Sequence, residues 1–257
     1  MTLLDEILTP SALTTLFQPI IKIGADGTRS LHGYEALTRG PRGTNASRAD
    51  VLFEYVRRKR AESVVDRVCA LAALRAASLL PQCPQLSLNV HAATLGHDPG
   101  FAELLVEVAQ SCGFRPDQIV VEIVEQSSRW STSGFTQGLA ELRAAGVRIA
   151  LDDLGFGHSN LYMMIAFRPD IVKIDRYFVS GIANDPARQA VLRSVQLLAS
   201  AIDCTVVAEG VEHAEELDAV RATGVSLMQG FLFSPPQSAA AFADLYPARP
   251  SAVSLSA

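Results

Sequence analysis

Cysteine and tryptophan are scarce in this sequence, and no hydrophobic run reaches membrane-spanning length. The four cysteines (Cys69, Cys83, Cys112 and Cys204) are far apart and fall in or beside apolar segments, which predicts buried free thiols in a reducing compartment. The five histidines lack the spacing of zinc ligands. The first twenty residues have no basic segment followed by a long apolar core, so we expect a cytoplasmic chain without membrane contact.

Composition and length fit a globular α/β chain. Hydrophobic residues make up 49% of the 257 residues and charged residues 19%, enough to fill a sizeable core in one large domain or two small ones. The net charge of −5 argues against a broad basic surface for long nucleic acid. A small phosphate ligand held through metal ions remains compatible with this charge.

Eight short β-rich runs recur along the chain, separated by longer segments with helical character. The runs are LFQPIIKI (16–23), HGYEALTR (32–39), QLSLNVH (85–91), IVVEIVE (119–125), RIALDDL (148–154), DIVKID (170–175), TVVAEG (205–210) and LMQGFLF (227–233). Strand-then-helix repetition indicates a parallel sheet, and eight such strands indicate a TIM (β/α)8 barrel.

Two regions depart from this repeat. The connection 24–31 is too short for a helical crossover and contains an Asp-Gly turn signal, so the first strand is expected to be antiparallel to the second. Residues 40–80 combine a loop with one or two helices, and VRRKR (56–60) is interpreted as a solvated helix face in preference to a binding patch. We expect the barrel over 1–247 and a tail or linker over 248–257, with a further regulatory domain possible beyond it.

Polar residues gather at the ends of the eight runs, where a barrel of this kind carries its chemistry. In chain order they are Gln18, Glu35, Arg39, Asn89, Glu122, Glu125, Asp152, Asp153, Lys173, Asp175, Glu209, Glu212 and Gln229. A lone acid is usually a helix cap or an ion-pair partner. So many carboxylates on one rim would repel each other unless cations neutralise them, and oxygen ligands suit Mg²⁺ or Mn²⁺.

The adjacent acids Asp152 and Asp153 end an apolar run and precede Gly-x-Gly. Neighbouring side chains on a strand point to opposite faces, but the chain is already turning at a strand tip, so both can reach a metal. Two metal ions generate a hydroxide and stabilise both oxygens of an in-line phosphoryl displacement. Lys173 would orient that hydroxide or neutralise phosphate charge; a salt bridge to Asp175 or Asp153 is the simpler interpretation.

The same residues resemble a known family, the EAL-domain cyclic di-GMP phosphodiesterases, over residues 16 to about 245. Glu35-Ala36-Leu37 matches the motif that names the family, although this tripeptide alone is a weak signal. Around it stand, in the family's order, FQPI, GYEALTR, LSLNV, VEIVE, LDDLGFGHSNL, PDIVKIDRYFV, VAEGVE and QGFLFSPP. Together these motifs are specific.

The resemblance implies a modified barrel with an antiparallel first strand and metal-dependent hydrolysis of cyclic di-GMP to linear pGpG, with two Mg²⁺ or Mn²⁺ ions. It implies one metal held by Glu35, Asn89, Glu122 and Asp152, a second held by Asp152, Asp153 and Glu209, and Lys173 as the water-positioning lysine. Substrate-binding positions match Gln18, Leu37, Arg39 and Gln229, and supporting positions match Glu125, Asp175 and Glu212. Glu125 resembles the residue that anchors the loop after the two aspartates, a loop the family uses for dimerisation.

The sequence departs from the family pattern in that loop, where Leu154, Phe156, His158 and Asn160 stand. His91 stands where serine is common, beside Asn89. We expect a homodimer built on the loop around Phe156 and the following segment SNLYMMIAF.

Two other functions fit parts of the sequence. The first is a non-catalytic cyclic di-GMP receptor, favoured by the altered loop but not by the intact set of metal-ligand positions. The second, reached without the resemblance, is an enolase-type barrel in which a lysine abstracts a proton beside Mg²⁺-bound carboxylates. That chemistry gives no role to Gln18, Arg39 or the Asp-Asp pair.

Overall fold

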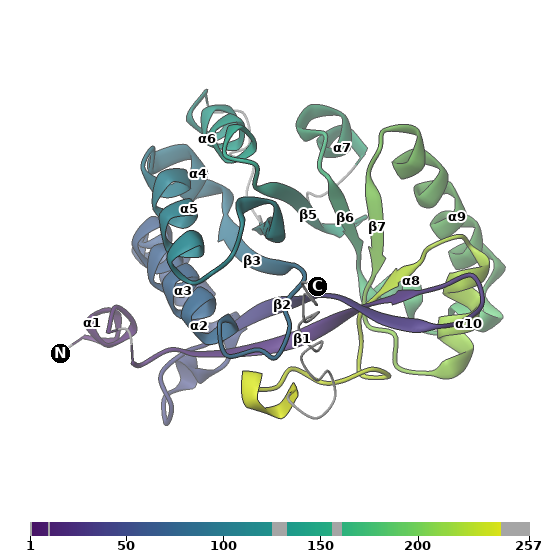
Figure 1. Cartoon of the computed structure of the whole chain (residues 1–257), viewed down its shortest axis with the longest axis horizontal. Coiled ribbons are helices and arrows are strands. Elements are labelled where there is room, and N and C mark those ends of the chain that lie inside the picture. The colour runs from purple at the N-terminus through teal and green to yellow at the C-terminus, as the bar shows by residue number, and fades with distance from the viewer. Residues whose placement is uncertain (1, 10, 125–132, 156–160, 243–257) are drawn as a thin grey trace, which may run out of the picture.

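Eight strands close into a barrel in the computed structural model, which describes residues 2–9, 11–124, 133–155 and 161–242 (Figure 1). The strands follow one another around the barrel in chain order. They are β1 (Thr14–Ile23), β2 (Arg29–Arg39), β3 (Leu86–His91), β4 (Ile119–Val124), β5 (Arg148–Leu154), β6 (Ile171–Ile174), β7 (Thr205–Ala208) and β8 (Leu227–Met228). The predicted TIM-like barrel is confirmed.

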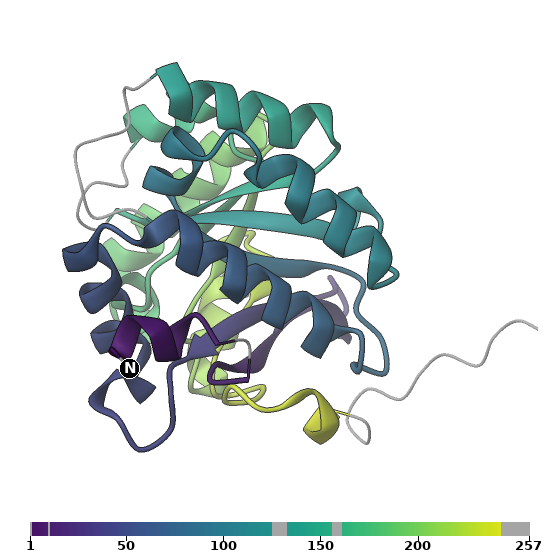
Figure 2. The same cartoon turned by 90° about the vertical axis from the view of Figure 1, so that its left-hand side faces the viewer.

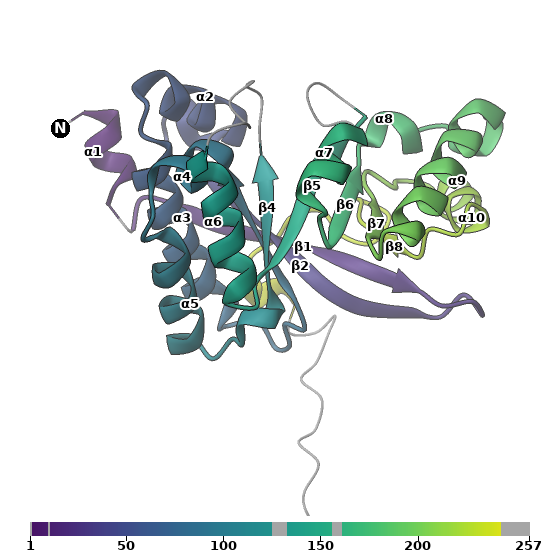
Figure 3. The same ribbon diagram turned by 90° about the horizontal axis from the view of Figure 1, so that it is seen from above.

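Strand β1 runs against both of its neighbours. It pairs antiparallel with β2 through the turn after Ile23 and antiparallel with β8, whereas every pair from β2–β3 to β7–β8 is parallel. Figure 3 shows the β1–β2 hairpin reaching beyond the neighbouring strands at its turn. The short connection excluded a helical crossover, and the predicted antiparallel first strand is confirmed.

Helices cover the outside of the barrel (Figure 2). Their bounds are α1 (Leu3–Ile7), α2 (Ala49–Lys59), α3 (Glu62–Ala77), α4 (Ala92–His97), α5 (Phe101–Ser111), α6 (Ser133–Ala144), α7 (Leu161–Phe167), α8 (Arg176–Val179), α9 (Pro186–Ala201) and α10 (Ala214–Ala222). Residues 40–80 therefore hold two helices. VRRKR ends α2, where Arg57 and Arg58 pair with Glu54. Residues 58–60 are exposed, as a solvated face requires, whereas Val56 is buried and Arg57 is partly exposed and lines a cavity.

The barrel interior is apolar below its carboxyl-end rim. Ile20, Val120, Ala150, Ile171, Val207 and Leu227 form a buried cluster that fills this layer. A larger core packs the outer faces of the strands against the helices. A rigid apolar layer of this kind fixes the strand ends above it, where polar side chains lie.

The last predicted run was wrong in extent, because β8 ends at Met228 and residues 229–233 are not strand. At Gly230 a Cβ would lie 2.1 Å from the carbonyl oxygen of Val211, so the chain packs backbone against backbone there. Phe233 N then donates to the Gly230 carbonyl in a turn. The expected tail 248–257 lies outside the described residues, as does the expected domain boundary at 247.

All four cysteines are free: Cys69 and Cys204 are buried as expected, but Cys83 and Cys112 are partly exposed. Among the described helices, none has the length and apolar character needed to cross a membrane.

Candidate active site

Lys173 lies at the centre of four carboxylates at the carboxyl-end rim of the barrel. It projects from β6 and is 1% exposed. Its Nζ lies 3.0 Å from Glu35 Oε2, 2.9 Å from Glu122 Oε2, 3.5 Å from Asp152 Oδ1 and 2.6 Å from Glu209 Oε1. These acids come from β2, β4, β5 and the residue after β7. The barrel therefore brings together five residues that are up to 174 positions apart (209 − 35).

Two amides fix the carboxylate of Glu35. Asn89 Nδ2 donates to Glu35 Oε1 at 2.9 Å, and Gln229 Nε2 donates to Glu35 Oε2 at 2.7 Å and to Gln18 Oε1 at 2.9 Å. Burial alone would raise the pKa of Glu35, but the charge of Lys173 and these hydrogen bonds outweigh it and hold that pKa below its ordinary value. The Glu35 carboxylate is therefore oriented and ionised.

The other acids have raised pKa values. Burial, against the opposing charge of Lys173, raises the pKa of Glu122 to about 8, that of Glu209 well above its usual range, and that of Asp152 as well. Burial, followed by the charge of Asp152, raises the pKa of Asp153 to about 6. The described site thus holds more acid groups than Lys173 can neutralise, which favours binding of further positive charge.

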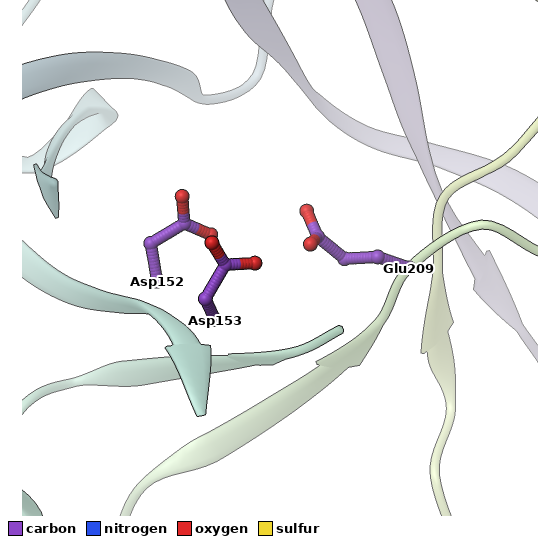
Figure 4. A group of neighbouring side chains, drawn as sticks. All are labelled: Asp152, Asp153 and Glu209. Carbon is purple, nitrogen blue, oxygen red and sulfur yellow. The ribbon is translucent and has the colours of Figure 1, made fainter. Parts of the chain in front are cut away.

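Asp152, Asp153 and Glu209 form a group that could hold a metal ion (Figure 4). One carboxylate oxygen from each lies within 4.8 Å of the others. Asp153 has a φ of 50°, in the left-handed region that Asp tolerates, and the β5–β6 register shifts between Leu151 and Leu154. This irregularity lets two adjacent side chains face one site.

The donor set suits a hard divalent cation, because it consists of carboxylate and amide oxygens. Asp152 Oδ1 is buried and has no short hydrogen bond from a described residue. The Lys173 ammonium lies as far as 3.5 Å from this oxygen, which leaves it able to accept a second cation or another donor. The residues therefore fit a divalent metal centre.

A cavity of about 490 Å³ opens beside this cluster, within the usual range for small-molecule sites. Glu35, Asn89 and Asp152 are among the residues that line it. Leu37 and Arg39 continue the wall along β2, and Arg39 donates to the carbonyl of its neighbour Thr38.

The remaining predicted residues lie around the cluster. Gln18 donates to the carbonyl of Ser234 at 3.1 Å. Asp175 caps α8 by accepting from Tyr177 N at 2.8 Å, and Glu212 pairs with Arg176 at 3.0 Å. These contacts give Asp175 and Glu212 structural roles. Glu125 lies outside the described residues, as does the loop around Phe156.

A buried polar group that the motifs do not reveal supports the rim next to Asn89. Asp66 accepts hydrogen bonds from His91 N at 2.8 Å and Thr94 Oγ1 at 2.5 Å, and its other oxygen lies 2.9 Å from His91 Nδ1. An acid inside the apolar run SVVDRVCALAAL was the available signal, since a buried carboxylate needs partners.

The fold and the site define a class: a TIM-like barrel with a lysine-centred acidic cluster at the carboxyl ends of its strands. A model of the EAL domain matches residues 3–236. The chain belongs to the EAL domain family.

Curated relatives span two kinds of protein. The cyclic di-GMP phosphodiesterase RocR of Pseudomonas aeruginosa is 33% identical over 174 residues, which is 68% of this chain and 44% of RocR. The blue light- and temperature-regulated antirepressor BluF of Escherichia coli is 28% identical over 149 residues, 58% of this chain and 37% of BluF. The chain spans less than half the length of these relatives.

Solved structures agree with the fold. The calcium/cyclic di-GMP complex of Klebsiella pneumoniae BlrP1 at pH 8.0 superimposes with a TM-score of 0.79 at 31% identity, covering 90% of this chain and 57% of that one. The manganese/cyclic di-GMP complex of the same protein at pH 9.0 gives 0.77 at 31% identity, covering 91% and 62%.

Proposed function

We propose that this protein hydrolyses one phosphodiester bond of cyclic di-GMP to give linear pGpG, with two divalent metal ions. The observation that carries the proposal is the convergence of four carboxylates on Lys173, next to the group Asp152, Asp153 and Glu209. RocR is named for this activity, and BlrP1 was crystallised with this nucleotide and with manganese or calcium.

The metal ligands proposed are those of the cluster. One Mg²⁺ or Mn²⁺ would be held by Glu35, Asn89, Glu122 and Asp152, and the other by Asp152, Asp153 and Glu209. Bound there, such ions activate water and stabilise the attacking and leaving oxygens of an in-line displacement. The low pKa of Glu35 suits it to bind metal at neutral pH.

Other residues would orient the reactants. The Lys173 ammonium can donate to an attacking water or to a phosphate oxygen beside it, and its surrounding acids keep it protonated. Gln229 holds Glu35 in place through its amide. The Arg39 guanidinium, on the cavity wall, can pair with the second phosphate, and Leu37 lines the same wall. Gln18, which accepts a hydrogen bond from Gln229 next to Glu35, would contact the substrate from the side of the cluster.

The test is an incubation of the purified chain with cyclic di-GMP and Mg²⁺ or Mn²⁺, followed by chromatographic separation of the nucleotides. We expect metal-dependent pGpG that disappears in Glu35→Ala. Glu103→Ala, which removes an exposed glutamate on α5, is the matched control and should keep full activity. Product from Glu35→Ala at the wild-type rate would contradict the proposed site.

A receptor without hydrolysis is the second candidate, because BluF, a relative, is named as an antirepressor. Calcium separates the two functions, since binding can be measured with Ca²⁺ and turnover with Mg²⁺ or Mn²⁺ on the same preparation. Tight binding in Ca²⁺ with no pGpG in either other ion would identify a receptor.

A homodimer through α7 is part of the proposal. Leu161, Tyr162 and Ile165 are 54%, 71% and 72% exposed, an apolar surface that a second copy could cover. Light scattering should give a dimer mass for the wild type and a monomer mass for Ile165→Glu. A monomer mass for the wild type at all concentrations would contradict it. A cytoplasmic location and a further C-terminal regulatory domain stay predictions.

A further inference from the structure

Asn89 holds Glu35 through one half of its amide. Asn89 Nδ2 donates to Glu35 Oε1 at 2.9 Å, so the amide oxygen is the atom that Asn89 can offer to a metal ion. Both contacts depend on where the last residues of β3 lie, because Asn89 is the third residue from the end of that strand. A displaced strand end would move the amide away from Glu35 and from the proposed metal position together.

The end of β3 has a paired strand on one side only. Its ladder with β4 continues from Leu86 to His91, whereas its ladder with β2 ends, among the described residues, at the pair of Ala36 and Leu88. Asn89 and the two residues after it therefore have no ladder partner in β2. Further support for the strand end has to come from outside the sheet.

Asp66 of α3 supplies that support. It is 1% exposed, its Oδ2 accepts hydrogen bonds from His91 N at 2.8 Å and Thr94 Oγ1 at 2.5 Å, and its Oδ1 lies 2.9 Å from His91 Nδ1. His91 is the N-cap of α4 and its own side chain makes no capping hydrogen bond, so a carboxylate from α3 takes that place. One acid thus fixes the last residue of β3 and the first turn of α4.

The carboxylate of Asp66 is itself held by packing. Val65, Cys69 and Ala70 of the same helix are buried around it, and α3 lies beside β3 and α4 (Figure 1). Movement of the strand end would leave a buried carboxylate without its donors, which is unfavourable. Helix α3 is therefore a rigid reference for the position of Asn89.

We propose that Asp66 is a positioning residue of the metal centre: by fixing the end of β3, it keeps the Asn89 amide nitrogen on Glu35 and the amide oxygen toward the metal. The inference rests on the proposed function, which assigns Asn89 to a metal ion. Asp66 is not among the residues that line the cavity, so its effect passes through Asn89.

Calorimetry of Mn²⁺ binding to the metal-free protein tests this role. Asp66→Ala should weaken the Mn²⁺ Kd by roughly tenfold, the lower end of what outer partners of a metal site contribute. Asp66→Asn should restore most of the affinity, because its amide can accept from His91 N and Thr94 Oγ1 and can donate to His91 Nδ1. Asp66→Ser, which leaves a small polar group in place of the carboxylate, carries the same test should Asp66→Ala fail to fold.

The matched control is Asp98→Ala. Asp98 also joins α3 to α4, through its ion pair with Arg67, but it follows the last residue of α4 and lies far along the chain from Asn89. Its variant removes an equivalent tie between the same two helices. It should leave the Mn²⁺ Kd unchanged, whatever it does to the Tm.

A double-mutant cycle separates positioning from general stability. In an Asn89→Ala background, Asp66→Ala should weaken Mn²⁺ binding no further, because its route to the metal has been removed. A second measurement needs no metal: the side-chain amide signals of Asn89 in the NMR spectrum, identified by their loss in Asn89→Ala. These signals should shift in Asp66→Ala and stay in place in Asp98→Ala.

Each result decides between the two proposals. If the wild type binds no Mn²⁺, the proposed metal centre fails and the positioning role fails with it. Mn²⁺ binding that depends on Asp66 as expected, without formation of pGpG, would contradict the proposed hydrolysis alone. The positioning role alone is overturned by equal Kd values for the wild type and Asp66→Ala, by the same loss of affinity with and without Asn89, or by unshifted Asn89 signals.

Discussion

The ammonium of Lys173 lies 2.6 Å from Oε1 of Glu209, the shortest of its four contacts with carboxylates. Burial would lower the pKa of Lys173, but the surrounding acids outweigh burial and raise it well above its ordinary value. A lysine in this state is a poor proton acceptor. The enolase-type chemistry, which needs lysine as a base, therefore does not suit this site.

Lys173→Met should destabilise the metal-free protein, because it leaves the ionised, buried carboxylate of Glu35 without its cation. Removing one partner of a buried ion pair costs about 3–5 kcal/mol. Each kcal/mol of lost stability lowers the Tm of a chain of this size by about 2–4 °C, so we expect a large fall in Tm. Thermal unfolding with and without Mn²⁺ checks this: Mn²⁺ should raise the Tm of the variant more than that of the wild type. Lys22→Met, at an exposed lysine of β1, is the control and should change neither value.

Asp153→Asn tests the second metal position with little disturbance of the backbone. Asn tolerates the left-handed conformation of residue 153 as well as Asp does, so the change removes a charge and keeps the bulge. We expect turnover in Mn²⁺ to fall by more than roughly 100-fold. Loss of a residue that only hydrogen-bonds to a metal ligand already lowers metal affinity or activity by about 10–100-fold.

The control for Asp153→Asn is Asp203→Asn, at another left-handed aspartate, exposed and remote from the cluster. It should retain wild-type turnover. A rate for Asp153→Asn within twofold of this control would remove Asp153 from the metal site.

The barrel could be predicted because each strand buries both of its faces and is therefore a short apolar run. Such runs can be recognised in the sequence alone. The site could be predicted in part because barrel chemistry lies at strand ends, so Glu35, Asp152 and Glu209 stand at recognisable places.

Other features depend on tertiary contacts that no local pattern encodes. The run 227–233 is apolar throughout, yet its strand ends at Met228 because Gly230 meets the backbone of Val211. The support of His91 by Asp66 joins residues 25 positions apart. The bulge at Asp153 follows from the loss of β5–β6 register, which composition does not reveal.

Glu216 should make stability depend on pH. It accepts hydrogen bonds from the backbone N–H groups of Gly181, Glu212 and His213 at 2.9–3.1 Å. Burial would raise the pKa of Glu216, but these bonds outweigh it and lower that pKa. The folded pKa lies below the unfolded one, so the stabilisation is present above the ordinary glutamate pKa and is lost as pH falls through the folded value.

Glu216→Gln should therefore lower the free energy of unfolding at pH 7 by about 1–3 kcal/mol and flatten its decline toward acid pH. Urea unfolding at a series of pH values checks both effects. Glu215→Gln, at the exposed neighbour in the same helical turn, should leave the curve unchanged. Parallel pH curves for wild type and Glu216→Gln would contradict the assignment.

Gly230→Ala should damage both stability and the site. The added Cβ would lie 2.1 Å from the carbonyl oxygen and 2.3 Å from the nitrogen of Val211, and backbone atoms cannot swing away as a side chain can. Overpacking of this kind costs about 1–3 kcal/mol. The shift also moves the adjacent Gln229, whose Nε2 lies 2.7 Å from Glu35 Oε2, so kcat should fall beyond what the lower Tm explains.

The comparison variant is Gly100→Ala, where the new Cβ would meet the far end of the Arg67 side chain at 3.2 Å, a group that can move. It should keep its Tm and its turnover. Equal Tm and equal kcat for both alanine variants would contradict this prediction. The loop after β8 would then be able to move away from Val211 without disturbing Gln229. In that case the close backbone packing would have no part in positioning the glutamine.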